Sequence, residues 1–250
     1  MKTSIVVPCR NEADNILPLI DEILETLADL DDFEIIVVDD CSDDGMAALL
    51  ADARNRLPKL RVLRHDRVGG QSAAIHSGVT AARFDIICTL DGDGQNPPAE
   101  LRNLLAPWAG PGASGLGLVA GQRMARKDVL ARRLASTFAN RIRGQVLKDG
   151  TRDTGCGLKS FRRKDFLALP YFNHMHRYLP ALFARDGWKI AHVDVSHRPR
   201  IGGRSHYSNL QRGIVGIFDL MGVAWLLRRR KVSRPTEVAP DRKPSEGDAS

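Results

Sequence analysis

The sequence is poor in cysteine, and it lacks the cysteine and histidine patterns that cross-link small domains or bind zinc. Its four cysteines are far apart and form no C-x-x-C pair: Cys9, Cys41, Cys88 and Cys156. The seven histidines include no pair at zinc-ligand spacing. These absences argue against a disulfide framework and a structural zinc site, and they predict reduced thiols in the cytoplasm.

Long hydrophobic runs are also missing. The apolar run at the start of the chain ends at Pro8 and Arg10, which makes it too short for a signal peptide. The longest apolar stretch, Gly213 to Leu227, contains Asp219 and falls short of the ~20 residues that cross a bilayer. We therefore expect no secretion signal and no membrane-spanning helix.

Acidic residues are outnumbered by basic ones. The 250 residues include 37 Lys and Arg against 30 Asp and Glu, which gives a formal net charge of +7. This excess favours anionic partners, but it does not choose among nucleic acid, anionic lipid and phosphorylated substrates. With 43% hydrophobic residues, the chain can bury the core of one large α/β domain.

Short β-branched runs alternate with helix-like segments along the chain. The expected strands are Ser4–Val7, Glu34–Val38, Arg61–Leu63, Ile86–Leu90, Leu116–Ala120 and Ala191–Val195. The expected helices are Glu12–Leu30, Met46–Leu57, Gln71–Arg83, Pro98–Trp108, a basic segment at Asp128–Leu147 and one near His174–Asp186. This alternation predicts an α/β fold with a doubly wound, mostly parallel sheet flanked by helices.

Polar loops follow three of the expected strands, at Pro8–Glu12, Asp39–Asp44 and Asp91–Gln95. Ligands of doubly wound sheets bind beyond the carboxyl ends of the strands, so these loops are expected to form one crevice. The first loop contains no G-x-G-x-x-G, which argues against a nicotinamide-dependent enzyme.

The segment Asp91-Gly92-Asp93-Gly94-Gln95 carries two carboxylates and an amide away from a buried strand. Side chains two residues apart share a face of an extended segment, so the oxygens of Asp91, Asp93 and Gln95 point the same way. Oxygen ligands of this kind suit Mg²⁺ or Mn²⁺ that holds a diphosphate. The alternative is an ordinary acidic turn, because Asp and Gly are common turn residues.

Asp39 and Asp40 end the second expected strand and allow two interpretations. They could cap the next helix, although Asp43 or Asp44 fits that role better. A carboxylate at the end of a strand in the crevice could instead accept a hydrogen bond from a base N–H or a ribose hydroxyl.

Three stretches, in this order and at this spacing, resemble the family 2 glycosyltransferases: Val6–Glu12, Val37–Gly45 and Leu90–Gln95. Two more, Gln95–Pro98 and Asp153–Lys159, are similar to the dolichol-phosphate mannosyltransferase branch and its bacterial polyprenyl-phosphate relatives. The resemblance covers the chain from Ser4 to Arg230 and implies a GT-A, Rossmann-like fold.

The resemblance also implies where ligands bind. The nucleotide is expected at Pro8, Arg10, Glu12 and one of Asp39 and Asp40. A divalent cation, Mg²⁺ or Mn²⁺, and the diphosphate are expected at Asp91, Asp93 and Gln95. The acceptor phosphate is expected at Arg123, Arg132 and Ser136, with Asp153 orienting acceptor-side groups. A mobile loop that closes on the diphosphate is expected to use Arg200, Ser205 and His206.

The reaction implied is inverting transfer of a hexose, with mannose favoured, from GDP-mannose or a UDP-hexose to dolichyl or undecaprenyl phosphate. One alternative is a family 2 transferase that acts on a polysaccharide or glycan hydroxyl and so needs a general base. The other is a non-catalytic module that binds nucleotide sugars. Nucleic acid is not an expected partner.

The end of the chain predicts contact with a membrane surface. Apolar residues dominate from Ser208 to Leu227, and four cations follow at positions 228–231. We expect a catalytic domain over 1–207, an interfacial amphipathic helix over 208–231 and a disordered tail over 232–250. The protein would then lie at the inner face of the membrane, with room for a separate membrane-protein partner. The alternative is a helix packed on the domain.

Overall fold

The structure is a computed structural model that describes residues 1–30, 32–124, 143–144, 146–147, 149–199, 209–229, 233 and 236–237, without the side chains of 209–215. Its centre is a seven-stranded sheet in the order β3-β2-β1-β4-β6-β5-β7. The strands are β1 (Thr3–Cys9), β2 (Phe33–Asp39), β3 (Leu60–Arg64), β4 (Ile86–Thr89), β5 (Leu116–Arg123), β6 (Lys159–Arg162) and β7 (Lys189–Val195). Six run in one direction and β6 runs against them. The predicted α/β fold with a mostly parallel sheet is confirmed.

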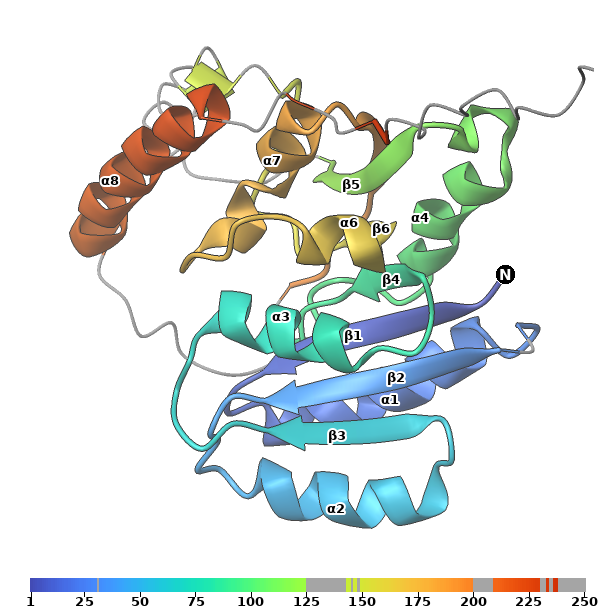
Figure 1. The fold of residues 1–250 in the computed structure, drawn as a ribbon. Coiled ribbons are helices and arrows are strands. Elements are labelled where there is room, and N and C mark those ends of the chain that lie inside the picture. Colours follow the sequence, from blue (N-terminus) through green and yellow to red (C-terminus); the bar gives the residue numbers. More distant parts are fainter. Residues whose placement is uncertain are drawn as a thin grey trace, which may run out of the picture.

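Helices cover both faces of the sheet (Figure 1). One face carries α1 (Ala13–Thr26), α2 (Met46–Arg56) and α4 (Glu100–Ala109). The other carries α3 (Gln71–Ala81), α6 (Arg163–Leu167), α7 (Leu179–Arg185) and α8 (Asn209–Arg228). Short 3₁₀ helices, η1 (Pro111–Ala113) and η2 (Met175–Arg177), connect these elements. Because both faces are covered, β1 and β2 are buried at every position, which explains their continuous apolar runs.

The antiparallel strand β6 is the main element that the sequence analysis did not predict. It has only four residues, too few to show a hydrophobic period, and it pairs with β4 on one side and β5 on the other. Long-range pairing therefore defines this strand, and it brings the loop before β6 to the end of β4.

Helix α3 lies close against β1 because Gly78 has no side chain. A Cβ at Gly78 would lie 2.4 Å from Cγ1 of Val6, closer than two atoms can pack. This approach brings the first residue of α3, Gln71, to the carboxyl edge of the sheet, where its side chain reaches Asp91.

Helix α8 lies beside α7 at the rim of the molecule (Figure 1). Its inner face packs on the core through Leu220, Val223 and Leu227. Its outer face exposes four large apolar side chains by 60 to 70%: Ile217, Phe218, Met221 and Trp225. One face of the helix therefore packs on the domain and the other is apolar toward solvent, and its contact with a membrane stays a prediction. Among the described residues, no helix has both the length and the apolar character needed to cross a membrane.

Candidate functional site

A pocket of about 340 Å³ opens at the carboxyl ends of β1, β2 and β4. Its walls come from the three predicted loops and from the start of α3. The lining residues are Pro8, Cys9, Arg10, Glu12, Asp40, Val68, Gly70, Gln71, Ala74, Asp91, Gly92 and Asp93. The structure therefore brings together six residues that the sequence analysis assigned to one site, namely Pro8, Arg10, Glu12, Asp40, Asp91 and Asp93.

The first two loops are tied to each other by Asn11, whose backbone has a positive φ of 55°. Its side-chain oxygen accepts a hydrogen bond from the Asp43 N–H at 3.0 Å, and its own N–H donates to the Ser42 hydroxyl at 3.0 Å. Asp44 accepts from the N–H groups of Ala13 and Met46, at the starts of α1 and α2. These bonds fix the loop that presents Arg10 and Glu12 to the pocket.

Asp39 and Asp40 make different contacts, although they are adjacent. Asp40 lines the pocket and accepts hydrogen bonds from the N–H groups of Gly69 and Gly70 at 2.8 and 2.7 Å. His65 Nδ1 lies 2.7 Å from the same carboxylate. Burial alone would raise the pKa of Asp40, but these hydrogen bonds outweigh burial and lower it. Asp40 thus holds the loop before α3 in place.

Asp39 is fully buried and accepts one hydrogen bond, from the Ser42 N–H to its Oδ1 at 2.9 Å. Its Oδ2 has no hydrogen-bond partner within the described chain, and Arg64 Nε lies 3.6 Å away. A buried carboxylate oxygen without a donor is unusual and marks a position where a ligand N–H could bond. Which of the two aspartates contacts a base stays a prediction.

Asp91 and Asp93 leave the end of β4 together. Burial, and then repulsion from the Asp93 carboxylate, raise the pKa of Asp91 to about 6. Asp93 Oδ1 accepts the Gln95 N–H at 3.2 Å. Within the described residues, no group of three or more His, Cys, Asp or Glu side chains could hold a metal ion by itself. Two repelling carboxylates fit a divalent cation whose remaining ligands are substrate phosphates and water.

Arg123 and Asp153 meet near Asp91, whose charge acts on the Arg123 guanidinium. They form a bidentate ion pair, with Arg123 Nε 2.5 Å and Nη2 2.9 Å from the two oxygens of Asp153. The Asp153 N–H donates to the side chain of Gln122 at 3.0 Å. The sequence analysis placed both residues on the acceptor side but did not predict that they pair. An acceptor phosphate at Arg123 would have to share the guanidinium with Asp153 or displace it.

Lys159 is a buried cation that the sequence analysis left without a role. It begins β6, is 4% exposed and donates to the carbonyl of Cys156. Burial lowers the pKa of Lys159, and the charges of Asp91 and Asp153 raise it in part. No signal for it was present in the sequence, because β6 is too short to be recognised as a buried strand, and only inside such a strand is a lysine unusual.

Several predicted residues are not in this pocket or cannot be placed. Asp39, Gln95, Arg123 and Asp153 are not among the residues that line it. Five further predictions fall on residues outside the described part of the chain: Arg132, Ser136, Arg200, Ser205 and His206. Cys9 was missed as a lining residue; its Sγ lies so close to Gly92 that a Cβ there would be only 2.3 Å away.

The glycosyl transferase family 2 model matches residues 4–169. The chain belongs to glycosyltransferase family 2. It is 32% identical over 236 residues to the dodecaprenyl-phosphate galacturonate synthase of Rhizobium johnstonii, which covers 91% of this chain and 68% of the relative. It is 34% identical over 210 residues to the undecaprenyl-phosphate 4-deoxy-4-formamido-L-arabinose transferase of Pectobacterium carotovorum, covering 83% and 63%. The chain thus spans about two thirds of the length of these relatives.

Solved structures agree on the fold of this glycosyltransferase. Mannosyl-3-phosphoglycerate synthase from Rubrobacter xylanophilus superposes with a TM-score of 0.68 at 20% identity, over 95% of this chain and 79% of that one. A mannosyltransferase from Pyrobaculum calidifontis, solved with GDP-Man and Mn²⁺, gives 0.67 at 21% identity, over 92% and 65%. The predicted GT-A fold and the resemblance to family 2 are confirmed.

Proposed function

We propose that this family 2 glycosyltransferase moves a sugar from a nucleoside diphosphate to a polyprenyl phosphate at a membrane surface, with inversion at the anomeric carbon. The observation that carries the proposal is the single pocket that joins the β1 and β2 loops to Asp91 and Asp93. The two relatives named above support the acceptor class, since both names specify a polyprenyl phosphate.

The proposed nucleotide site is the part of the pocket bounded by Pro8, Arg10, Glu12 and Asp40. The diphosphate would lie toward Asp91 and Asp93, where a divalent cation would neutralise the charge of the leaving nucleoside diphosphate. Asp91 and Asp93 would hold that cation, and Gln95 is the third predicted ligand. Arg10 is exposed at the mouth of the pocket and would add positive charge beside the phosphates.

The acceptor needs orientation more than it needs a base. A phosphate monoester has a second pKa of ~6 and is mostly dianionic at neutral pH, so its oxygen can attack without losing a proton first. Of the residues predicted to bind the acceptor phosphate, Arg123 is the one that the structure describes. Its ion pair with Asp153 fixes the plane of its guanidinium group. Transfer to a glycan hydroxyl, the second candidate, would instead require a general base beside the attacking oxygen.

The resemblance and the relatives specify different sugars. Resemblance to the dolichol-phosphate mannosyltransferase branch predicts mannose, whereas the relatives' names specify galacturonate and 4-deoxy-4-formamido-L-arabinose. The proposed donor class is therefore a nucleoside diphosphate of a six-membered-ring sugar, with mannose as one member.

A donor and acceptor screen tests the proposal. The protein is incubated with Mn²⁺, a short-chain polyprenyl phosphate and nucleoside diphosphates of mannose, glucose, galacturonate or 4-deoxy-4-formamido-L-arabinose, and products are identified by mass. A glycosylated polyprenyl phosphate is expected, and the matching polyprenol without phosphate should give none. Product only on glycan hydroxyls would support the second candidate. Tight donor binding without any product would support a binding module.

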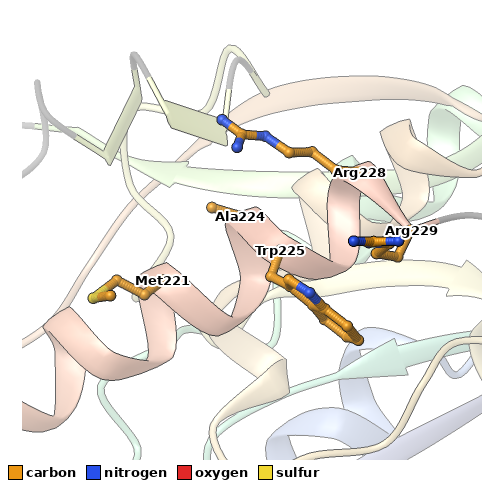
Figure 2. A pocket seen from close by; sticks show the side chains of 5 residues that line it. All are labelled: Met221, Ala224, Trp225, Arg228 and Arg229. Atoms are coloured by element: carbon orange, nitrogen blue, oxygen red, sulfur yellow. The ribbon is translucent and has the colours of Figure 1, made fainter.

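Membrane contact is proposed for the outer face of α8. A hollow of about 520 Å³ is lined by Met221, Ala224, Trp225 and Arg228 of α8 and by Arg229 just after it. Figure 2 shows how these side chains lie. Exposed apolar side chains followed by cations favour the headgroup region of an anionic bilayer. This surface would hold the enzyme where the lipid tail of its acceptor stays in the membrane, in the peripheral position at the inner face that the sequence predicts.

Liposome flotation tests this contact. The variant Phe218→Ser, Trp225→Ser removes apolar area from the outer face, and binding to vesicles that contain anionic lipid is expected to fall several-fold. Leu49→Ser, on α2 at the opposite edge of the sheet, removes an exposed apolar side chain elsewhere and serves as the matched control. Equal flotation of all three proteins would refute the role of α8.

A further inference from the structure

The carboxylate of Asp91 lies directly against the backbone of Gly157. A Cβ built on Gly157 would lie 2.1, 2.3 and 2.4 Å from Oδ2, Cγ and Oδ1 of Asp91. These three similar distances show that the carboxylate group packs over the glycine. The φ of Gly157 is not positive, so the position needs glycine for space and not for backbone conformation. Any side chain here would push the Asp91 carboxylate away.

Gly157 is itself fixed to the strand that delivers Asp91. The Thr89 hydroxyl, at the end of β4, donates to the Gly157 carbonyl at 2.6 Å. Two residues later, Lys159 pairs with Thr89 in the antiparallel β4–β6 ladder. The backbone behind the carboxylate is therefore tied to the end of β4 and leads directly into β6.

Two side-chain amides hold the oxygens of the same carboxylate. Gln71 Nε2 donates to Oδ1 at 2.7 Å, and Asn96 Nδ2 donates to Oδ2 at 3.2 Å. Asn96 is 3% exposed, and its own Oδ1 has no hydrogen-bond partner within the described residues. A buried amide that turns its nitrogen to Asp91 while its oxygen stays unpaired indicates that the contact with Asp91 determines its orientation.

We propose that Gly157, Gln71 and Asn96 form a clamp that sets the orientation in which Asp91 presents its free lone pairs to a divalent cation. A carboxylate has about four acceptor positions, and the two amides occupy two of them. This inference rests on the proposed function, because it takes a cation as the common ligand of Asp91 and Asp93.

The clamp members are positioning residues, so the test measures metal binding rather than turnover. Mn²⁺ alone is titrated into the full chain, and free Mn²⁺ is followed by its electron paramagnetic resonance signal. Gln71→Met keeps the length of the side chain and removes its donor, and Gly157→Ala fills the space behind the carboxylate. Loss of a group that orients a metal ligand typically weakens metal affinity by about 10- to 100-fold. We expect Mn²⁺ affinity to fall roughly tenfold in Gln71→Met and about 100-fold in Gly157→Ala.

Matched controls separate the clamp from general effects of the substitutions. Gly112→Ala adds a methyl group where no atom lies within 4 Å, and Asn103→Leu removes an exposed amide on α4 that does not line the pocket. Both should bind Mn²⁺ like the wild type. Gln71 is exposed at the start of α3, so Gln71→Met is expected to keep the wild-type melting temperature and decides the question if Gly157→Ala does not fold.

The outcomes distinguish this inference from the proposed function. Weaker Mn²⁺ binding in Gln71→Met at unchanged melting temperature, with normal controls, supports the clamp. If the wild type and Gln71→Met bind Mn²⁺ equally, the clamp is overturned while the metal site stands. If the wild type itself binds no Mn²⁺, the cation of the proposed function is wrong and the clamp falls with it.

Discussion

The two halves of this molecule, the one built on β1 to β4 and the one built from β5 onward, present functional groups in different ways. In the first half, side chains in loops directly after the strands bond to backbone N–H groups of neighbouring loops, as Asn11, Asp40 and Asp44 do. In the second half, Arg123 is held by its ion pair with Asp153. The loop before β6 is held because β6 pairs antiparallel with β4 and β5. The first half therefore holds its groups by hydrogen bonds from side chains to the backbone of neighbouring loops, and the second by a side-chain ion pair and antiparallel strand pairing.

The largest expected effect tests the first half. Asp93→Ala removes one of the two carboxylates proposed to hold the cation, and kcat should fall by about 10²–10³-fold even at saturating Mn²⁺. The measurement is the turnover of donor into glycolipid. Asp52→Ala, an exposed aspartate on α2, should keep full activity. Near-wild-type turnover of Asp93→Ala would remove this loop from the proposed mechanism.

The next effect tests the second half. Asp153→Asn leaves the Arg123 guanidinium, which is 10% exposed, without its charged partner, and the free energy of unfolding should fall by roughly 2–3 kcal/mol. Asp194→Asn breaks the exposed ion pair with Arg152 and should change the free energy of unfolding by less than ~0.5 kcal/mol. Urea unfolding of both variants measures the difference. Equal effects would show that burial of the Arg123 pair does not matter.

A smaller effect, on stability, is expected from truncating side chains on the two faces of α8. Val223→Ala truncates a side chain that is 1% exposed against the core, and the free energy of unfolding should fall by roughly 1–2 kcal/mol. Phe218→Ala removes a side chain that is 70% exposed and should leave stability almost unchanged. Thermal unfolding of the two variants checks this. A large loss for Phe218→Ala would mean that its ring is covered in the folded protein.

The smallest expected effect concerns pH. The lowered pKa of Asp40 stabilises the folded protein above the pKa of an unfolded aspartate, about 3.9, and this contribution is lost as pH falls through the lower folded pKa. Asp91 acts in the opposite direction. Because the pKa of Asp91 is raised to about 6 in the folded protein, its ionisation lowers the free energy of unfolding as pH rises from about 4 to about 6. Urea unfolding across this pH range, without metal, should show a decline in wild type that is absent in Asp91→Asn.

Much of the first half could be predicted from the sequence. The apolar runs predicted β1, β2 and β4 within two residues at each end, because buried parallel strands are uniformly apolar. The topological rule for doubly wound sheets predicted that Asp40 and Asp91 would meet at one edge. The contacts of Asp40 with Gly69 and Gly70 were not predictable, since they depend on how a loop 29 residues away folds back.

The second half shows where sequence patterns stop being informative. Strand β6 has no period of its own, and its place between β4 and β5 depends on pairing with residues about 70 and 40 positions earlier. Gly157 looks like a loop glycine in the sequence, and only the fold shows the Asp91 carboxylate against it. In the same way, the apolar pattern of α8 did not reveal that one face would pack and the other stay exposed.

The sequence by itself determined the α/β fold, the family and the set of polar loops, because strand burial, turn residues and motif spacing are local properties of the chain. Only the tertiary structure decided which oxygens of Asp39, Asp40 and Asp91 are already bonded, that Arg123 is paired, and which side of α8 is exposed. Those properties depend on atoms brought together from distant positions, and local periodicity carries no information about such distances.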